Sequence, residues 1–217
     1  MTTERTKKES LRRALSILCN ALSVVLVIYA VSAFFTVGGE GNMQVRNTHC
    51  FIYFTVDSNI LAALTSVLML VYQIKGKGIP QWALITKFVG ATAVGVTFFT
   101  VVFFLGPLMG YKAMFAGNNL YLHMVVPLLE MASFCLWETG RPLSFRESLW
   151  GVLPTVVYGT VYLVMVIVIG PEKGGWFDFY GFNMGGLWYV SYIAMAAATL
   201  GLCQLLRFLN RAAGKKH

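Results

Sequence analysis

The stretch SLWGVLPTVVYGTVYLVMVIVI, residues 148–169, runs for 22 positions without one charged side chain. An α-helix needs about 20 predominantly apolar residues to cross the roughly 30 Å hydrocarbon core of a bilayer. The stretch therefore predicts a transmembrane helix. Five further runs that are almost free of charge lie at residues 14–36, 51–74, 84–105, 119–137 and 185–206.

The composition of the whole chain favours the same class of protein. Of its 217 residues, 57% are hydrophobic and only 12% are charged. An ordinary soluble domain carries about 25% charged residues. So few charges cannot cover a surface in water, which argues against a disordered chain, a disulfide scaffold and a soluble nucleic-acid binder.

The apolar runs take up most of the chain and leave no room for a separate soluble domain. Residues 1–217 are therefore expected to form one domain, an all-α polytopic membrane protein with short connections. The predicted transmembrane helices number six, at about residues 11–36, 51–74, 84–105, 119–137, 146–169 and 185–209.

The basic residues are distributed unevenly between the two sides of such a bundle. Of the 17 lysine and arginine residues, 14 fall in the N-terminus, the 75–87 loop, the 138–147 loop and the C-terminus. Only Arg46, Lys112 and Lys173 fall on the opposite side. Cytoplasmic segments carry the excess of such residues, so both termini are expected in the cytoplasm of a multi-pass protein of the cell membrane. The net charge of +8 needs no nucleic-acid partner.

The N-terminus has a second interpretation, as a cleavable signal peptide. Basic residues, an apolar run and the small residues Ala30-Val31-Ser32-Ala33 fit that pattern. However, the apolar run is longer than the 7–15 residues of a signal sequence, and cleavage would break the charge alternation. A retained first helix is favoured.

Polar side chains interrupt the second predicted helix. Thr55 and Asn59 are four residues apart and share a helix face, whereas Asp57 points about 200° away from Thr55. Ionisable residues within transmembrane segments usually face the interior of the bundle and mark function. Thr55 alone also has a simpler interpretation, a hydroxyl bonded to its own helix backbone.

The fourth predicted helix carries His123 and Glu130, two turns apart on one stripe. Pro127 has no N–H to donate to the carbonyl of His123, which leaves that carbonyl without its helical partner. If helices two and four both run inward, Thr55 and His123 each lie about 6 Å below the outer boundary and Glu130 about 17 Å. A hydroxyl and an imidazole at equal depth can meet if the two helices are neighbours.

These residues resemble a known family. The segment FTVDSN at residues 54–59, with LHMVVP at residues 122–127, is similar to the androgen-induced, FAR-17a-like integral membrane proteins and their prokaryotic six-helix relatives. GGWFDF at residues 174–179 is similar to an aromatic segment of that family, although it lacks the proline found there. The resemblance extends over nearly the whole chain in helix count and spacing, with one residue fewer between histidine and proline than in the animal members.

Members of that family hydrolyse fatty acid esters of hydroxy fatty acids with an intramembrane threonine and histidine. The resemblance thus implies a lipid-ester hydrolase with Thr55 as nucleophile and His123 as base. Its partner would be a lipid or fatty-acyl ester, and no metal or cofactor is expected. A threonine hydroxyl needs such a base, because it is a weak nucleophile until its proton is removed.

Supporting roles follow from the same chemistry. Asp57, Asn59 and Asn119 are unranked candidates for orienting the imidazole, and Asn59 or N–H groups before helix four are candidate donors to the oxyanion. Glu130 is expected to have a structural or proton-handling role. The aromatic residues of the last outer loop form either an interfacial belt or a lid over the substrate, with Trp176, Phe179 and Tyr180 as the lid residues.

Two other functions remain open at this point. The first is a non-enzymatic carrier or receptor, in which Asp57, His123 and Glu130 bind an amphipathic ligand. The second is a haem protein with His49 and His123 as axial ligands.

Overall fold

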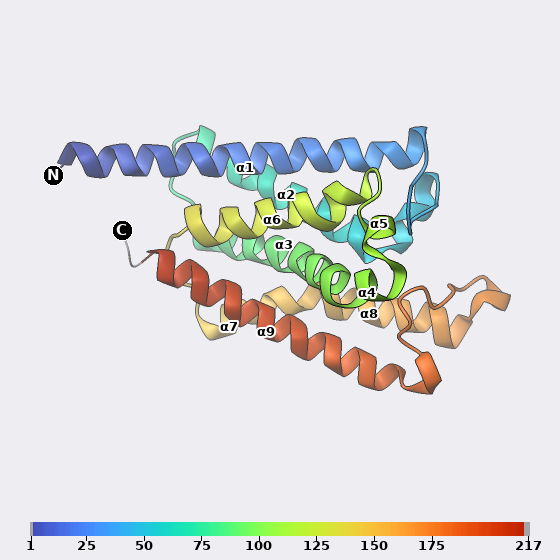
Figure 1. Cartoon of the computed structure of the whole chain (residues 1–217). Helices are drawn as coiled ribbons and strands as arrows, with labels where there is room; N and C mark the ends of the chain where they lie inside the picture. Colours follow the sequence, from blue (N-terminus) through green and yellow to red (C-terminus); the bar gives the residue numbers. More distant parts are fainter. Residues whose placement is uncertain (1, 215–217) are drawn as a thin grey trace.

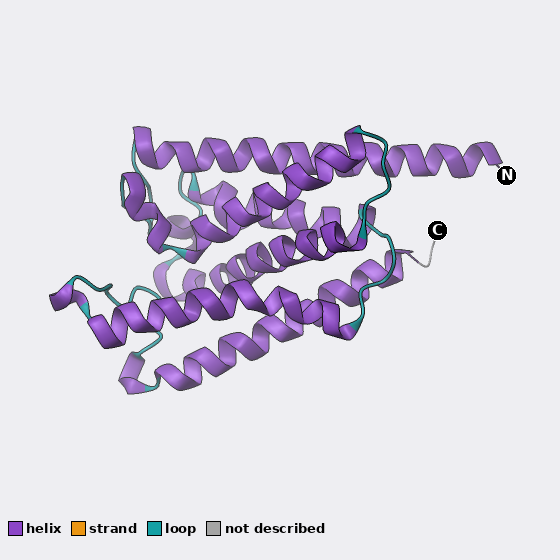
Figure 2. Cartoon of the chain, turned by 180° about the vertical axis from the view of Figure 1, so that it is seen from behind, coloured by secondary structure: helices purple, strands orange, loops and turns teal. Residues whose placement is uncertain are grey.

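The computed structural model describes residues 2–214, and within that range all regular structure is helical, with no strand (Figure 2). The first half holds the helix α1 (Thr2–Thr36), the short 3-10 helix η1 (Asn47–Ile52) and α2 (Phe54–Ile74). A third rod continues from α3 (Gln81–Thr100) through the π-helical turn η2 (Val101–Leu105) into α4 (Gly106–Met109), and α5 (Tyr111–Met114) follows it.

The second half begins with a rod that we call the histidine helix, Tyr121–Trp137. It consists of η3 (Tyr121–Val125), α6 (Val126–Ala132) and η4 (Ser133–Trp137). The next rod combines α7 (Phe145–Ser148), η5 (Leu149–Val152), α8 (Leu153–Leu163) and η6 (Val164–Ile169). The short helices η7 (Pro171–Lys173) and η8 (Met184–Gly186) precede the last long helix, α9 (Trp188–Gly214).

Five of these rods are long and apolar enough to cross a membrane, so the chain is a multi-pass membrane protein by the length and composition of its helices. The histidine helix, predicted at 119–137, is the shorter sixth rod; its span from residue 121 to residue 137 is about 26 Å, at the lower limit for crossing. The five longer rods are Lys7–Thr36, Phe54–Ile74, Gln81–Met109, Phe145–Ile169 and Trp188–Gly214.

The rods pack as a bundle in which α1 and α9 lie on opposite sides (Figure 1). Between them, α2 contacts both α1 and α3, while α6 contacts α3 and α1. The two ends of the described chain lie at the same end of the bundle (Figure 1). The histidine helix thus packs against α1, α2 and α3, and its last part, η4, also packs against α9, which buries its polar side chains.

A glycine sets the close approach of α2 and α3. A Cβ atom on Gly90 would lie 2.6 Å from the Thr65 hydroxyl and 3.1 Å from the Ala62 Cα atom. Small residues at such positions let helix backbones come close enough for side-chain contacts across a membrane bundle. This contact holds α2 against the centre of the bundle.

Proline explains two of the π-helical turns. Pro107 and Pro127 each follow such a turn by two residues, and neither can donate to the carbonyl four positions earlier. The backbone instead makes longer-range bonds, from Gly106 N–H to the Val101 carbonyl and from Val126 N–H to the Tyr121 carbonyl. The second of these turns contains His123. π-turns are often found at functional sites.

Candidate active site

The side chains of Thr55 and His123 meet inside the bundle. Thr55 Oγ1 lies 3.4 Å from His123 Nε2, and the two residues are only 6% and 1% exposed. Sequence order left open whether α2 and the histidine helix are neighbours. The structure places them side by side and brings these two groups into contact.

A backbone carbonyl orients the imidazole. His123 Nδ1 lies 2.6 Å from the carbonyl oxygen of Met114, at the end of α5. Because a carbonyl can only accept a hydrogen bond, Nδ1 of the neutral ring carries the proton. Nε2 is then unprotonated and accepts from the Thr55 hydroxyl, as a general base must.

The side chains expected to orient the ring lie elsewhere. Asn119 donates to the Glu40 carbonyl at 2.7 Å and to Asn42 Oδ1 at 3.0 Å, which ties it to the 37–46 loop. Asp57 lines a separate cavity of about 300 Å³, together with Pro154 of α8. Neither is a partner of His123.

Asn59 contributes to the site as a brace. Its Nδ2 donates to the Thr55 carbonyl at 2.7 Å and to the Leu122 carbonyl at 2.9 Å. These bonds join α2 to the histidine helix at the level of the Thr55–His123 contact. Since both N–H bonds of the amide are used, Asn59 has no donor left for an oxyanion, contrary to one of the expectations above.

Thr55 lies closer to the start of its helix than the sequence suggested. The expected helix begins at residue 51, but residues 47–52 form a 3-10 helix and Tyr53 is extended, with φ −98° and ψ 126°. Thr55 is thus the second residue of α2. The positive end of the helix dipole and the unpaired N–H groups of a first turn lie there.

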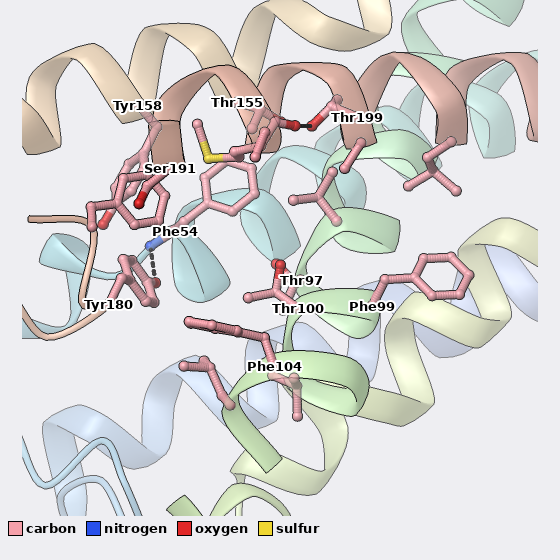
Figure 3. Close-up of a pocket in the computed structure, with 18 of the residues that line it drawn as sticks. Phe54, Thr97, Phe99, Thr100, Phe104, Thr155, Tyr158, Tyr180, Ser191 and Thr199 are labelled. Carbon is pink, nitrogen blue, oxygen red and sulfur yellow. Dashed lines mark hydrogen bonds between the residues drawn. The ribbon is translucent and has the colours of Figure 1, made fainter. Parts of the chain in front are cut away.

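Thr55 lines a cavity of about 690 Å³. Aliphatic and aromatic side chains make up most of its lining, as in sites for apolar ligands. On α9 the lining extends from Val190 to Leu205, which is about 22 Å along a helix. That length suits a long acyl chain. Its lining residues in Figure 3 include Phe54, Thr97, Phe99, Thr100, Phe104, Thr155, Tyr158, Tyr180, Ser191 and Thr199.

The three expected lid residues take different positions. Tyr180 lines the large cavity next to Thr55, whereas Trp176 lines the smaller cavity of Asp57. Phe179 packs against Tyr53, with ring centroids 4.8 Å apart.

A residue that sequence reasoning missed, Asp178, holds the loop that carries these aromatics. Its carboxylate accepts from the Tyr162 hydroxyl and from the N–H groups of Phe182 and Asn183, each at 2.8 Å. The sequence feature that could have indicated this role is an acidic residue between aromatic residues, Phe177 and Phe179. This bonding fixes the loop to α8.

Glu130 belongs to a second buried polar group. Its Oε2 pairs with Lys87 Nζ at 2.6 Å, both side chains being fully buried, and its Oε1 accepts from Ser66 at 2.6 Å. Lys87 was expected among the charges of the cytoplasmic 75–87 loop. That assignment is wrong, because α3 begins at Gln81 and carries Lys87 into the bundle.

Further polar residues extend this group toward the end of the bundle where the chain ends lie. Lys87 also donates to Asn20 Oδ1 at 2.7 Å, and Asn20 in turn donates to Glu138. Most of these residues lie in or next to apolar runs and were not predicted. We call the group the lysine cluster; it comprises Ser16, Asn20, Ser66, Gln73, Lys87, Glu130, Ser133 and Glu138.

The geometry does not favour the two other functions considered above. Asp57, His123 and Glu130 lie in three different surroundings, so they do not form one ligand site. His49 is exposed on η1, and both ring nitrogens of His123 are engaged. Among the side chains that the structure describes, those of residues 7–214, no three His, Cys, Asp or Glu are grouped to hold a metal.

Comparison with known proteins identifies no relative. The chain matches no protein-family model, no curated protein and no solved structure. The candidate site therefore rests on the residues themselves and on their geometry.

Proposed function

We propose that this chain is an intramembrane hydrolase of long-chain carboxylic esters, with Thr55 as nucleophile and His123 as general base. The observation that carries the proposal is the Thr55–His123 contact, with the unprotonated Nε2 facing the hydroxyl, on the wall of an apolar cavity. The cavity suits an acyl chain, and the family resemblance suggests esters of hydroxy fatty acids as substrates.

The first half of the reaction transfers the acyl group to the protein. His123 Nε2 removes the Thr55 proton as Oγ1 adds to the ester carbonyl carbon, and the π-electron pair moves onto the carbonyl oxygen. When this intermediate collapses, the bond to the alcohol oxygen breaks. His123 returns its proton to that oxygen, and an acyl-Thr55 ester remains.

The second half releases the acid. His123 removes a proton from a water molecule, whose oxygen adds to the acyl carbon. The bond to Thr55 Oγ1 then breaks and the hydroxyl regains its proton. Neither half needs a charged group in the resting site, which fits its burial.

Purified protein in detergent tests the proposal with a panel of long-chain esters. Thr55→Ala and His123→Ala should each abolish hydrolysis, and a long-chain phosphonate should label the wild type at Thr55. Matched controls are Thr86→Ala, whose hydroxyl bonds to the Trp82 carbonyl on α3, and His49→Ala on η1. Full hydrolysis by Thr55→Ala would exclude the covalent mechanism.

We also propose that the histidine helix crosses the cell membrane as a sixth span, with both chain ends in the cytoplasm. The shared position of the two ends and the excess of basic residues there support this orientation. Single cysteines at positions 112 and 173 should react with an impermeant reagent from outside, and one at position 77 from inside. The four native cysteines are buried and give little background. The reverse labelling pattern would overturn the topology.

A further inference from the structure

Hydrolysis at Thr55 requires a donor for the oxyanion. The negative charge that develops on the carbonyl oxygen is stabilised in esterases by hydrogen-bond donors already in place. Asn59, the amide closest in sequence, uses both of its N–H bonds on backbone carbonyls. The donor must therefore come from another part of the cavity wall beside Thr55.

The Tyr180 hydroxyl is on that wall. Tyr180, Phe54 and Thr55 line the same cavity, and the N–H of Phe54 donates to the Tyr180 oxygen at 3.2 Å (Figure 3). The side chain of Thr55 also interacts with this hydroxyl. Because the oxygen accepts from the backbone, the phenol proton points away from Phe54. Tyr158, whose own hydroxyl donates to the Ile52 carbonyl, also interacts with the Tyr180 hydroxyl, so a ligand oxygen would take the place of that contact.

The tyrosine is held firmly in this place. Its backbone N–H donates to the Tyr162 hydroxyl at 2.9 Å, and that hydroxyl is bonded to Asp178. Its ring packs on Phe179, with centroids 4.7 Å apart. A donor fixed before the reaction loses little free energy to reorganisation in the transition state.

The protonation state suits a donor. Burial raises the pKa of Tyr180 above that of an ordinary phenol, so the hydroxyl keeps its proton at neutral pH. The first-turn N–H of Thr55, at the positive end of α2, is a second donor of the same kind.

We propose that Tyr180 is a catalytic residue, whose hydroxyl donates to the oxyanion formed when Thr55 attacks the ester. This inference rests on the proposed hydrolase function. No bond to Tyr180 forms or breaks: the electron pair moves from the C=O bond to the oxygen, and it returns when the alcohol leaves with the proton from His123.

Tyr180→Phe tests the role, because it removes the hydroxyl and keeps the packing ring. We expect kcat to fall roughly 10²–10³-fold, as for loss of an oxyanion donor in other enzymes, with KM little changed. Tyr192→Phe is the matched control. The Tyr192 hydroxyl, on α9, bonds to Thr160 and to the Val156 carbonyl of α8, and Tyr192 is not part of the cavity lining. The kcat of this variant should therefore equal that of the wild type.

A trifluoromethyl ketone with a long alkyl chain separates a catalytic role from a structural one. It forms a tetrahedral adduct with a serine or threonine nucleophile, so its affinity should fall with kcat in Tyr180→Phe. Its non-fluorinated methyl ketone analogue should bind both proteins equally. Equal loss of both ligands would show damage to the cavity and overturn the proposal.

A third measurement covers the case in which Tyr180→Phe does not fold. With 3-fluorotyrosine at position 180, the ¹⁹F resonance should shift when the trifluoromethyl ketone binds to the wild type and stay in place in Thr55→Ala. If the resonance does not move although the protein is active, the proposed role of Tyr180 is overturned and the hydrolase function is not. An inactive wild type that no phosphonate labels overturns the hydrolase function instead.

Discussion

The two buried polar groups of this bundle differ in how closely their central atoms are paired. In the lysine cluster, the Lys87 ammonium has three acceptors at 2.6–2.7 Å. At the Thr55–His123 contact, two neutral groups lie 3.4 Å apart and one of them lines a cavity. Both groups join α2 to the histidine helix.

The difference indicates separate purposes. A buried ion pair is tolerated only when hydrogen bonds satisfy both partners, and it then fixes the arrangement of the helices around it. A neutral hydroxyl and imidazole have a smaller desolvation cost and become charged only as a reaction proceeds. We therefore expect changes in the lysine cluster to affect stability, and changes at Thr55 and His123 to affect turnover.

The largest effect on folding is expected for Lys87→Met. Removing one partner of a buried pair leaves an uncompensated charge and costs about 3–5 kcal/mol, which thermal unfolding in detergent would measure. The double variant Lys87→Met/Glu130→Leu should recover most of this loss, because neither member of the pair is left without the other. A Lys87→Met protein as stable as the wild type would contradict the comparison.

Thr55→Ala and His123→Ala should produce the opposite pattern. Loss of a general base lowers the rate roughly 10²–10⁴-fold, whereas the melting temperature should stay close to that of the wild type. Since the two groups act as a unit, the double variant should be little slower than either single variant. Additive losses of rate would show that they act independently.

Asn59→Ala lies between the two patterns. It removes the donor to the Thr55 and Leu122 carbonyls and should cost about 1–3 kcal/mol of stability. The rate should also fall, because the brace sets the distance between the reactive groups. Unfolding and initial rates measured on one preparation would test both parts; loss of stability without loss of rate would limit Asn59 to packing.

Thr55→Ser keeps an oxygen at the reactive position, so partial activity is expected. The missing methyl group frees the side-chain torsion, since β-branched residues are restricted at χ1, and we expect a reduction of several-fold. Steady-state kinetics would measure it. A variant as inactive as Thr55→Ala would argue against a nucleophilic oxygen.

The smallest effect is expected for Asp57→Asn. Sequence reasoning placed Asp57 among the residues that orient His123, but it lines the smaller cavity and the ring is bonded to Met114. The rate should stay within about twofold of the wild type. That factor corresponds to a few tenths of a kcal/mol, the usual effect of a substitution away from such sites. A large loss would restore Asp57 to the site.

The sequence predicted the helical class well because apolar run length is a direct physical requirement of the bilayer. It also singled out Thr55 and His123, since polar groups within such runs are rare. It misjudged Lys87, because a charge near the end of an apolar run looks like a loop residue until the true start of α3 is known.

Other features depended on long-range contacts that no local pattern encodes. The partner of the His123 ring is a backbone carbonyl on α5, and a carbonyl leaves no mark on residue type. The place of Tyr180 beside Thr55 depends on the fold of the loop between α8 and α9. By their chemistry alone, Asn119 and Asp57 could each have bonded to the His123 ring. The structure gives them other neighbours: Asn119 bonds to the 37–46 loop, and Asp57 lines the smaller cavity.

The bond from His123 to the Met114 carbonyl has a consequence for mutational tolerance. In a triad with an acidic side chain, substitution removes the third member, whereas here every amino acid at position 114 supplies the same oxygen. A saturation scan should therefore find position 114 permissive for apolar residues that fill the same buried volume, while positions 55 and 123 are restricted. Under the proposed mechanism, related chains built this way would share the threonine and the histidine and show no invariant third residue.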